Sequence, residues 1–491
     1  MSPFLRKLLV ALAVILIIVG GFTAWIWRGT PAKHSLTELS GTKPLLVDAG
    51  RAETIPSVSI AEPVGWAANE APVAAQGLTV TRFATGLDHP RTMLSLPNGD
   101  VLVAETRDPP SQGGGLLGWI QDLLMTKAGA TGPSANTIVL LRDADGDGVA
   151  EARFALRKEG LSSPSGMAWG TDKLYVANHD AVLAFDYALG ATALTGAPTK
   201  LMDLPPAGNH WMRNLLLSPD GKKLYVAVGS SSNIAENGLE AEQGRAAIWE
   251  IDLASGDRRQ YAGGLRNPNG MGWNPSTGEL WTVVNERDQL GPDLVPDYLT
   301  NVPVGAHYGW PWRYWKTFTD ERVQLTPPEF LDDYVRKPEY GLGAHVAPLG
   351  FVFDAGGHRM GSQFANGAFI ARHGSWNRKP LSGYDVVFVK FDAKGNPQGV
   401  PVPVLSGFLT GKGTTRGRPT WVAWDKGGAL LVSDDTAGIV WRVIAAGSAP
   451  SVAPKAVVSG GMPPVKDLEG DPDEATYSAS FKKGDPADLK Q

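Results

Sequence analysis

Histidine and arginine residues stand in short polar loops, most of which lead directly into an apolar segment. Guanidinium groups bind carboxylates and other anions through paired hydrogen bonds, and an imidazole exchanges protons near neutral pH. If these loops meet in space, they form a cationic pocket for an anionic ligand with a histidine base beside it. The residues expected to face one another there are His89, Arg91, His210, Arg213, Arg266, Asn267, His345, Arg416 and Arg418.

A second set of side chains suits a hard metal ion. Asp143, Asp145 and Asp147 alternate in the segment DADGDGVAE (143–151). This spacing reproduces the first half of an EF-hand calcium loop, in which carboxylate oxygens bind the cation. Position twelve of such a loop is Phe154 rather than a glutamate, which argues against a complete EF-hand. Two interpretations remain: a single surface calcium loop, and an acidic turn between two strands.

The elements that would position these loops form an internal repeat. A turn followed by an apolar strand occurs six times, as in LPNGDVLVAE (96–105) and SPDGKKLYVAVG (218–229). Asn-Gly, Asp-Gly and Gly-Gly pairs supply the positive φ angles of tight hairpin turns, and the alternation after them is typical of strands. Six such units favour the blades of a β-propeller over a β-sandwich, which needs no repetition. We predict an all-β, six-bladed β-propeller over residues 78–447, with the polar loops at one mouth of its central channel.

Composition agrees with a large globular protein that does not bind nucleic acid. Of 491 residues, 43% are hydrophobic and 19% charged, with 59 glycines and 37 prolines. Such a mixture is typical of many turns that join short strands. The formal net charge of −5, without a basic run, provides no surface for nucleic acid. The absence of cysteine removes disulfides, thiolate metal sites and cysteine nucleophiles.

The N-terminus determines the expected compartment. Arg6 and Lys7 precede an uncharged run from Leu8 to Trp27, which is long enough to cross the hydrocarbon core of a bilayer. Positive residues ahead of the run favour a cytoplasmic N-terminus. We predict a single transmembrane signal anchor over residues 1–28, with a cleaved signal peptide as the alternative. The rest of the chain is then expected in the periplasm, held at the inner membrane.

Two segments flank the predicted propeller. Residues 29–77 are rich in proline, alanine and polar side chains, and we predict a linker that partly packs on the propeller. Residues 448–491 are polar, with proline, glycine and mixed charge, and are expected to form an extended or disordered tail.

Six motifs, in the same order, resemble the family of sugar dehydrogenases that use pyrroloquinoline quinone (PQQ). They are GNHWMRNLLLSPDGKKLYVAVG (208–229), GLRNPNGMGWNPSTGELW (264–281), NERDQLGPD (285–293), HYGWPW (307–312), HGSWNR (373–378) and TRGRPTWVAWD (415–425). The chain looks most similar to the membrane-bound L-sorbosone dehydrogenase branch. The resemblance implies oxidation of an aldose or sorbosone-like sugar by hydride transfer to the quinone, with calcium as a second cofactor.

The resemblance also implies roles for particular residues. His210 is the general base, and Arg418 stabilises charge that develops on the quinone oxygen. Arg416 and Arg418 form an Arg-x-Arg pair whose forked guanidinium groups suit carboxylate or quinone oxygens. Arg266, in the LRNPNG segment, is a further cofactor-binding candidate.

Two positions depart from the family's pattern. Asn233 matches the asparagine of a cofactor-contacting Arg-Asn pair, but Ser232 stands where the family has the arginine. The family's cofactor-binding lysine has no clear match, and Arg378 is the preferred substitute.

Calcium in this family bridges the cofactor and the protein, largely through backbone carbonyls that a sequence does not reveal. The carboxylates that follow the family's acidic segments are Glu286 and Asp288 in NERDQLGPD and Glu240 in ENGLEAEQG. Hard oxygen ligands of this kind favour calcium over transition metals.

Other classes of function remain open. A calcium-dependent propeller lactonase or other hydrolase would centre its metal on converging Glu, Asn and Asp side chains, whereas the predicted mouth is rich in Arg and His. A non-catalytic binding scaffold would not need His210 together with the Arg-x-Arg pair, and a family member that has lost PQQ would explain Ser232. The favoured interpretation implies three partners: a small sugar, the membrane through the N-terminal helix, and membrane quinone as the electron acceptor.

Overall fold

The structure is a computed structural model, and a few segments of the chain lie outside its description. It describes residues 2–28, 30–46, 53, 58–109, 123–130, 132–170, 172–206, 208–329, 331–354, 356–411 and 413–449. The predicted C-terminal tail (448–491) lies outside the described residues from position 450 onward.

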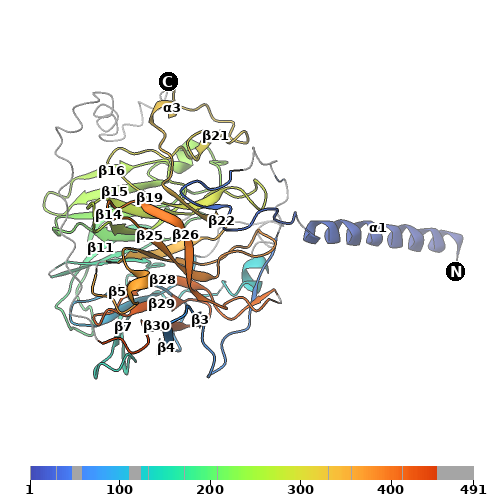
Figure 1. Cartoon of the computed structure of the whole chain (residues 1–491). Coiled ribbons are helices and arrows are strands. Elements are labelled where there is room, and N and C mark those ends of the chain that lie inside the picture. Colours follow the sequence, from blue (N-terminus) through green and yellow to red (C-terminus); the bar gives the residue numbers. More distant parts are fainter. Residues whose placement is uncertain are drawn as a thin grey trace.

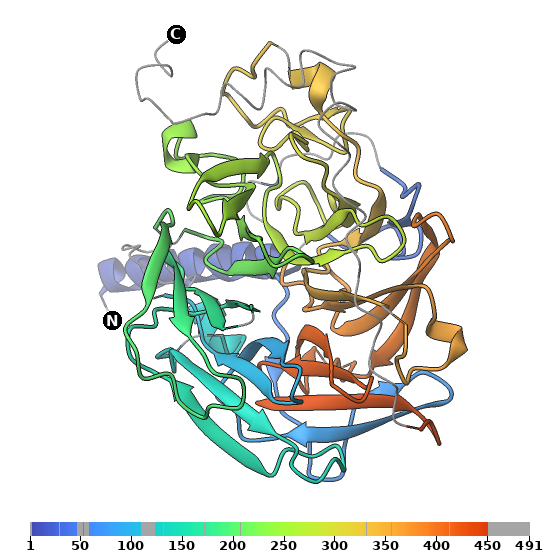
Figure 2. The same cartoon turned by 90° about the vertical axis from the view of Figure 1, so that its left-hand side faces the viewer.

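Within the described residues, six antiparallel sheets of four or five strands stand around a central axis (Figures 1 and 2). Their innermost strands contact one another in sequence, and the last contacts the first, so that the ring is closed. The inner strands are β5 (Pro90–Ser95), β9 (Gly166–Trp169), β13 (Arg213–Leu217), β17 (Pro268–Trp273), β23 (Pro348–Phe353) and β28 (Pro419–Trp424). This arrangement confirms the six-bladed propeller predicted from the repeat.

The second strand of each blade is the apolar strand that follows a predicted turn. These strands are β6 (Val101–Glu105), β10 (Lys173–Ala177), β14 (Lys223–Val228), β18 (Leu280–Val284), β24 (Gly367–Arg372) and β29 (Leu430–Asp434). Almost all of their residues are buried, because each blade packs between two neighbours and both faces are covered.

Two further strands complete each blade. The third strands are β7 (Thr137–Arg142), β11 (Ala181–Asp186), β15 (Ala247–Asp252), β19 (Pro296–Asn301), β25 (Asp385–Phe391) and β30 (Ile439–Ala445). The next strands outward are β8 (Ala152–Arg157), β12 (Thr199–Asp203), β16 (Arg258–Ala262), β22 (Tyr340–Ala344), β26 (Pro397–Ser406) and β4 (Leu78–Ala84).

The sixth blade joins the two ends of the propeller. β4 precedes every other blade strand except the two short edge strands β1 and β3, yet it pairs antiparallel with β30, from Val440 opposite Ala84 to Ala445 opposite Leu78. Because one sheet contains both ends of the domain, the ring cannot open without breaking this ladder.

Glycines on the inner strands allow the blades to approach closely at the axis. A Cβ added to Gly166 would lie 2.5 Å from the carbonyl oxygen of Arg213, and one added to Gly270 would lie 2.6 Å from that of Leu349. No side chain fits at these distances. The close approach explains why a glycine recurs at the start of several inner strands.

The segment before the propeller packs against it. β1 (Ser40–Gly41) pairs with β22 and β3 (Val73–Ala74) pairs with β26, so that each adds a fifth strand to a blade. β2 (Glu62–Pro63) pairs in parallel with β27 (Thr414–Thr415). Smaller elements lie in the connections between strands: β20 (Arg313–Tyr314), β21 (Phe318–Thr319), α3 (Leu331–Tyr334) and the 3-10 turns Leu239–Glu242 and Ser362–Phe364.

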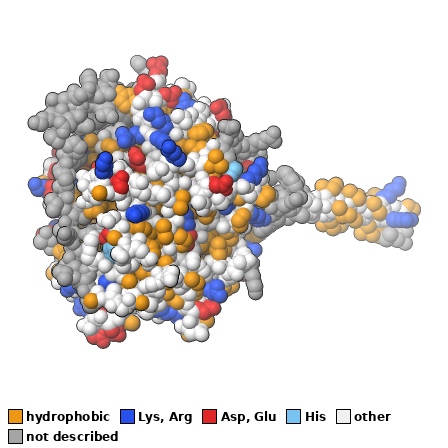
Figure 3. Space-filling view, viewed as in Figure 1, with side chains coloured by type: hydrophobic (Ala, Val, Ile, Leu, Met, Phe, Trp, Pro, Cys, Tyr) orange, Lys and Arg blue, Asp and Glu red, His pale blue; other side chains and the backbone are white. Residues whose placement is uncertain are grey.

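The N-terminal helix α1 (Pro3–Arg28) projects away from the propeller. Its part from Pro3 to Gly21 is long and apolar enough to cross a membrane, and none of it is buried by the part of the protein that the structure describes. Figure 3 shows its hydrophobic side chains on the outside, with basic side chains near the free end. A membrane span and a signal sequence both meet this description.

Candidate active site at the mouth of the propeller

The loops predicted to converge do open at one end of the propeller. They precede the inner strands, and the connections between second and third strands lie beside them. The two kinds of loop are joined by backbone hydrogen bonds: Ser230 N donates to Arg266 O at 2.8 Å, and His373 N donates to Ala347 O at 2.9 Å. The polar side chains at this end, which we call the mouth, form two clusters.

His210 lies in the loop before β13, and its ring is held from one side. Its Nδ1 is 2.9 Å from both the carbonyl oxygen and the hydroxyl oxygen of Ser230. A carbonyl only accepts, so we assign the proton to Nδ1, which leaves Nε2 as the basic nitrogen. Burial lowers the pKa of His210 to about 3, and the nearby charge of Arg266 acts in the same direction. The imidazole is therefore neutral at neutral pH and able to accept a proton.

Arg266 and Asn233 form a buried pair in the first cluster. The guanidinium of Arg266 donates from Nη2 to Asn233 Oδ1 at 2.9 Å and to Asp288 Oδ2 at 3.1 Å. It also donates from Nη1 to the carbonyl oxygen of Glu286 at 2.6 Å. Asn233 therefore does have an arginine beside it, although the residue before it in the sequence is Ser232. This arginine, Arg266, comes from the loop before β17.

Asp288 links this pair to two more residues of the mouth. Its Oδ1 accepts from Asn377 Nδ2 at 2.8 Å and lies 3.5 Å from Nδ1 of His345. Burial alone would raise the pKa of Asp288, but the charge of Arg266 and the hydrogen bond with His345 bring it well below its usual range. The Oδ1 atom of Asn377 is buried and has no hydrogen-bond partner among the described residues. An oxygen in this state suits a cation or a donor from a ligand.

The second cluster surrounds Asp435. Its Oδ2 accepts from Arg91 Nη1 at 2.5 Å and from His373 Nε2 at 2.9 Å, and lies 3.5 Å from His89 Nε2. Burial opposes the charge of Asp435, but His373, His89 and Arg91 hold its pKa well below the usual range.

Arg418 completes this second cluster. It donates from Nη2 to the hydroxyl of Tyr384 at 2.7 Å, and its guanidinium lies 5.0 Å from the centre of that ring. The Nε–H groups of Arg418 and Arg91 are buried and without a partner among the described residues. Buried donors of this kind suit the oxygens of an anionic ligand. Arginines outside this cluster, among them Arg107, Arg245 and Arg336, also have such a donor.

Four predicted residues turn away from the centre of the mouth. Arg416 lies at the outer edge of the mouth, which we call the rim. There it contacts Glu70 at 3.3 Å and the ring of Trp66. Arg378 donates to Asp293 Oδ1 at 3.0 Å and to three backbone carbonyls.

The remaining two are Ser232, in the connection between β14 and β15, and Arg213, the first residue of β13. Ser232 donates to Glu242 Oε1 at 2.7 Å. Arg213 donates to the carbonyl oxygens of His210 and Pro205, so it supports the His210 loop.

The three carboxylates predicted as calcium ligands near the cofactor are dispersed. Glu286 is buried against Arg287, whose Nε donates to it at 3.0 Å. Asp288 is paired with Arg266, as described above. Glu240 is exposed on the 3-10 turn Leu239–Glu242.

Sequence reasoning missed Asp435 and Tyr384, which hold the mouth arginines. A signal for Asp435 was present, because several second strands end in polar residues: VAE, VAN, VVNE and VSDD. A polar side chain at the end of a buried strand costs free energy unless it contacts other polar groups, so these residues indicate polar contacts at the mouth.

The acidic loop DADGDGVAE lies between β7 and β8, at the end of the propeller opposite the mouth. One oxygen each of Asp143, Asp145, Asp147 and Glu151 lie within 4.8 Å of one another. Glu151 is the ninth residue of this loop. Its carboxylate lies where it could take the place of the glutamate that an EF-hand has at position twelve. Asp143 accepts hydrogen bonds from Gly146 N and Gly148 N, which keeps the loop closed around the group.

We expect calcium to raise the melting temperature of the protein by about 2–4 °C through this loop, because a ligand that binds only the folded state stabilises it. Asp145→Asn, which removes one charged ligand without changing side-chain size, should abolish most of the shift. The measurement is a thermal unfolding series in calcium and in chelator. Equal shifts in the two proteins would show that calcium acts elsewhere.

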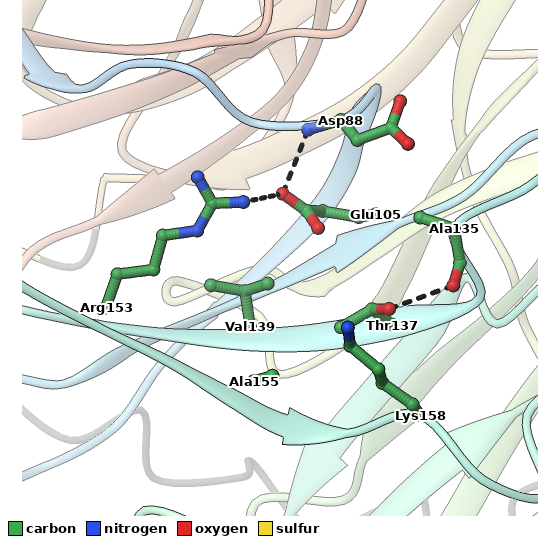
Figure 4. Close-up of a pocket in the computed structure, with 8 residues that line it drawn as sticks. All are labelled: Asp88, Glu105, Ala135, Thr137, Val139, Arg153, Ala155 and Lys158. Atoms are coloured by element: carbon green, nitrogen blue, oxygen red, sulfur yellow. Dashed lines mark hydrogen bonds and ion pairs between the residues drawn. The ribbon is translucent and has the colours of Figure 1, made fainter.

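A separate hollow of about 490 Å³ lies beside the first blade (Figure 4). Three of its four charged lining side chains are paired: Arg153 contacts Glu105 at 2.5 Å, and Asp88 contacts Arg107 at 2.8 Å. None of the predicted catalytic or cofactor-binding residues lines it. The mouth is the better candidate for an anionic ligand because it brings Arg91, Arg418 and His210 to one end of the propeller.

We expect the buried histidines to lower the unfolding free energy of the ligand-free protein as the pH decreases from about 6.5. Buried carboxyls act in the opposite direction, since burial raises the pKa of Asp297 to about 7 and that of Asp434 to about 6. Burial lowers the pKa of His89, His307 and His373 to about 4. In the unfolded chain these histidines have a higher pKa, so the unfolded chain binds more protons than the folded protein between about pH 6.5 and 4. Proton binding therefore lowers the free energy of the unfolded state relative to the folded state. The expected loss is on the order of 1.4 kcal/mol per pH unit for each fully buried histidine.

Urea unfolding at a series of pH values measures this slope. His307→Asn, which keeps an acceptor near Gly309 N, should flatten it. An unchanged slope in that variant would assign the acid sensitivity to other groups.

The fold and the mouth together define a class: a six-bladed propeller with a neutral histidine and buried arginines at one end. The chain matches the family model described as TrAA12-like over residues 121–302 and 318–446, and it belongs to this family.

Several known proteins are similar to this chain. It is 25% identical to a pyrroloquinoline quinone-dependent sugar dehydrogenase of Hypocrea jecorina, over 76% of this chain and 89% of that protein. It is 25% identical to a pyrroloquinoline quinone-dependent pyranose dehydrogenase of Coprinopsis cinerea, of which it spans 55%. It is also 27% identical, over 58% of its length and 76% of the relative, to an uncharacterised protein of Borreliella burgdorferi.

Two solved structures share the fold. A Trichoderma reesei structure of the carbohydrate-active enzyme family AA12 superposes with a TM-score of 0.63 and 21% identity, over 77% of this chain and 98% of the other. The holo form of the PQQ domain of Coprinopsis cinerea pyranose dehydrogenase gives a TM-score of 0.60 at 20% identity, over 78% of this chain and all of the other.

Proposed function

We propose that this protein oxidises a sugar with PQQ as the hydride acceptor. The observation that carries the proposal is that two kinds of group occur together at the mouth. One is His210, a neutral base whose basic nitrogen is Nε2. The other is a set of arginines with unpartnered N–H groups. PQQ is a planar quinone with three carboxylates, so its binding requires cationic donors. Arg91 and Arg418 offer such donors, and the named relatives in Hypocrea jecorina and Coprinopsis cinerea depend on PQQ.

Each residue has a defined task in this reaction. His210 accepts the hydroxyl proton of the sugar at Nε2, while Ser230 keeps the ring oriented through Nδ1. Arg418, with its unpartnered Nε–H, would hold an oxygen of the cofactor and would stabilise negative charge there. Arg266 and Asn233 provide a second polar wall. Bound PQQ supplies the two-electron acceptor.

Calcium at the mouth would bind oxygens other than the predicted carboxylates. Glu286 and Asp288 are neutralised by Arg287 and Arg266, and a cation beside a guanidinium is unfavourable. The unpartnered Oδ1 of Asn377 and nearby backbone carbonyls are the better ligands.

The apolar helix α1 suggests where the reaction takes place. We infer that it stays attached and anchors the propeller at the periplasmic face of the inner membrane, with a membrane quinone as the final electron acceptor. The substrate class we propose is an aldose or a sorbosone-like aldehyde.

Reconstitution of the full chain with PQQ and calcium, followed by dye-linked oxidation of a panel of aldoses and aldehydes, tests the proposal. We expect activity only when both additions are present. Arg418→Lys keeps the charge but loses the forked donor, and we expect PQQ to bind it about 10–100-fold more weakly. Failure of the wild-type protein to bind PQQ in the presence of calcium would contradict the proposal and favour a hydrolase or a binding scaffold.

A further inference from the structure

The chain passes from α1 directly onto the rim of the mouth. α1 ends at Arg28. Four residues later, Ala32 N donates a hydrogen bond to the carbonyl oxygen of Lys379, and the next residue, Lys33, donates from its backbone N to Asp293 Oδ2 at 2.7 Å. An extended chain of four residues spans at most about 14 Å. The end of the helix therefore lies within that distance of the rim.

Both attachment points belong to mouth loops. Lys379 lies in the connection between β24 and β25, and Asp293 lies in the connection between β18 and β19. The second connection also carries Asp288, and Gly291 within it accepts from His345 Nε2 at 3.0 Å. The tether is thus fixed to the same loops that form the first polar cluster, and not to the outer edge of a blade or to the opposite end.

The following segment continues along this rim. Ser59 N donates to the carbonyl oxygen of Trp376 at 2.7 Å, and Val64 N donates to that of Thr415 at 2.7 Å. In Figure 1, α1 leaves one side of the propeller, and in Figure 2, where the blades surround the axis, α1 lies behind them. The helix therefore emerges at the mouth end.

Large apolar side chains are exposed on the mouth loops. Val64 is 60% exposed, Leu239 44% and Trp376 39%. They come from three separate parts of the chain: the segment beside β27, the connection between β14 and β15, and the connection between β24 and β25. Tryptophan and aliphatic side chains of this kind insert favourably between lipid headgroups, where an amphipathic ring is half in water.

We propose that the propeller rests with its mouth against the bilayer surface, so that the reaction centre opens toward the lipid headgroups. The partner of this surface is the lipid bilayer. The short tether carries this orientation, because a propeller lying on its opposite end would hold the rim a full strand length away from the bilayer surface, farther than the four residues of the tether reach. The exposed apolar side chains of the mouth loops suit the same orientation. The inference rests on the anchoring role proposed for α1 and goes beyond it, since an anchor alone does not orient a domain.

Single cysteines test this orientation cleanly, because the chain has none of its own. We would place a spin label at Trp376→Cys, Leu239→Cys or Val64→Cys in the full chain, in nanodiscs of phosphatidylcholine and phosphatidylglycerol. Val149→Cys and Leu189→Cys are matched controls: they are 45% and 43% exposed, in the connections at the opposite end. The readout is the collision rate of the label with oxygen, which enters lipid, and with a water-soluble nickel chelate.

Labels on the mouth are expected to collide several-fold less often with the nickel chelate than the two control labels. Equal rates at both ends, with α1 still in the disc, would overturn the proposed orientation. Flotation of the unlabelled protein with vesicles tests the anchor separately, and a protein that does not float would overturn the proposal at that step. None of these readouts depends on PQQ or on catalysis, so failure of the orientation and failure of the proposed activity are distinguishable.

Discussion

His210→Ala is expected to lower kcat for sugar oxidation by about 10²–10⁴-fold while PQQ still binds. The imidazole is neutral because burial lowers its pKa to about 3, and its Nδ1 is occupied by Ser230, so Nε2 is the available base. The alanine variant lacks any group that can take the hydroxyl proton at this position. The measurement is the dye-linked rate at saturating sugar, together with PQQ binding by absorbance titration.

Two comparisons separate a catalytic loss from a structural one. Ser230→Ala removes only one of the two acceptors on Nδ1, because the carbonyl oxygen remains, and we expect it to lower kcat less than ten-fold. Added imidazole should partly restore the rate of His210→Ala if the missing group is a base. A fully active His210→Ala enzyme with bound PQQ would assign proton abstraction to another residue.

Asp435→Asn is expected to lower the unfolding free energy by about 3–5 kcal/mol. Asp435 is buried and its carboxylate neutralises Arg91, which lies in the same buried cluster. Removal of the carboxylate leaves the guanidinium charged without a partner, and an isolated buried charge is strongly destabilising. Urea unfolding at neutral pH measures the change.

The pH dependence of this variant has a definite sign. The pKa of Asp435 is depressed in the folded protein, so its stabilising effect is present above the pKa of an unfolded aspartate and is lost as the pH falls through the folded value. The difference between wild type and Asp435→Asn should therefore shrink at strongly acidic pH. Asp186→Asn, at an exposed pair with Lys173, is the control and should change stability by less than about 1 kcal/mol. A similarly small effect of Asp435→Asn would show that Arg91 finds another partner.

The second cluster illustrates the limits of reasoning from the sequence. Arg91 and His89 were expected at the mouth because they precede an inner strand, and the structure places them there. Asp435, which pairs with Arg91, is 344 positions away in the chain. No spacing rule connects two residues so distant, so the partner of the guanidinium emerged only from the fold.

The amino-acid sequence by itself determined the six blades, the closed set of mouth loops and the apolar N-terminal helix. Hairpin turns, strand alternation and long apolar runs are local signals, and a few neighbouring residues suffice to produce them. Only the tertiary structure decided which arginines face the channel. The physical reason is that charge pairing depends on distances between remote segments, which packing sets and local sequence does not.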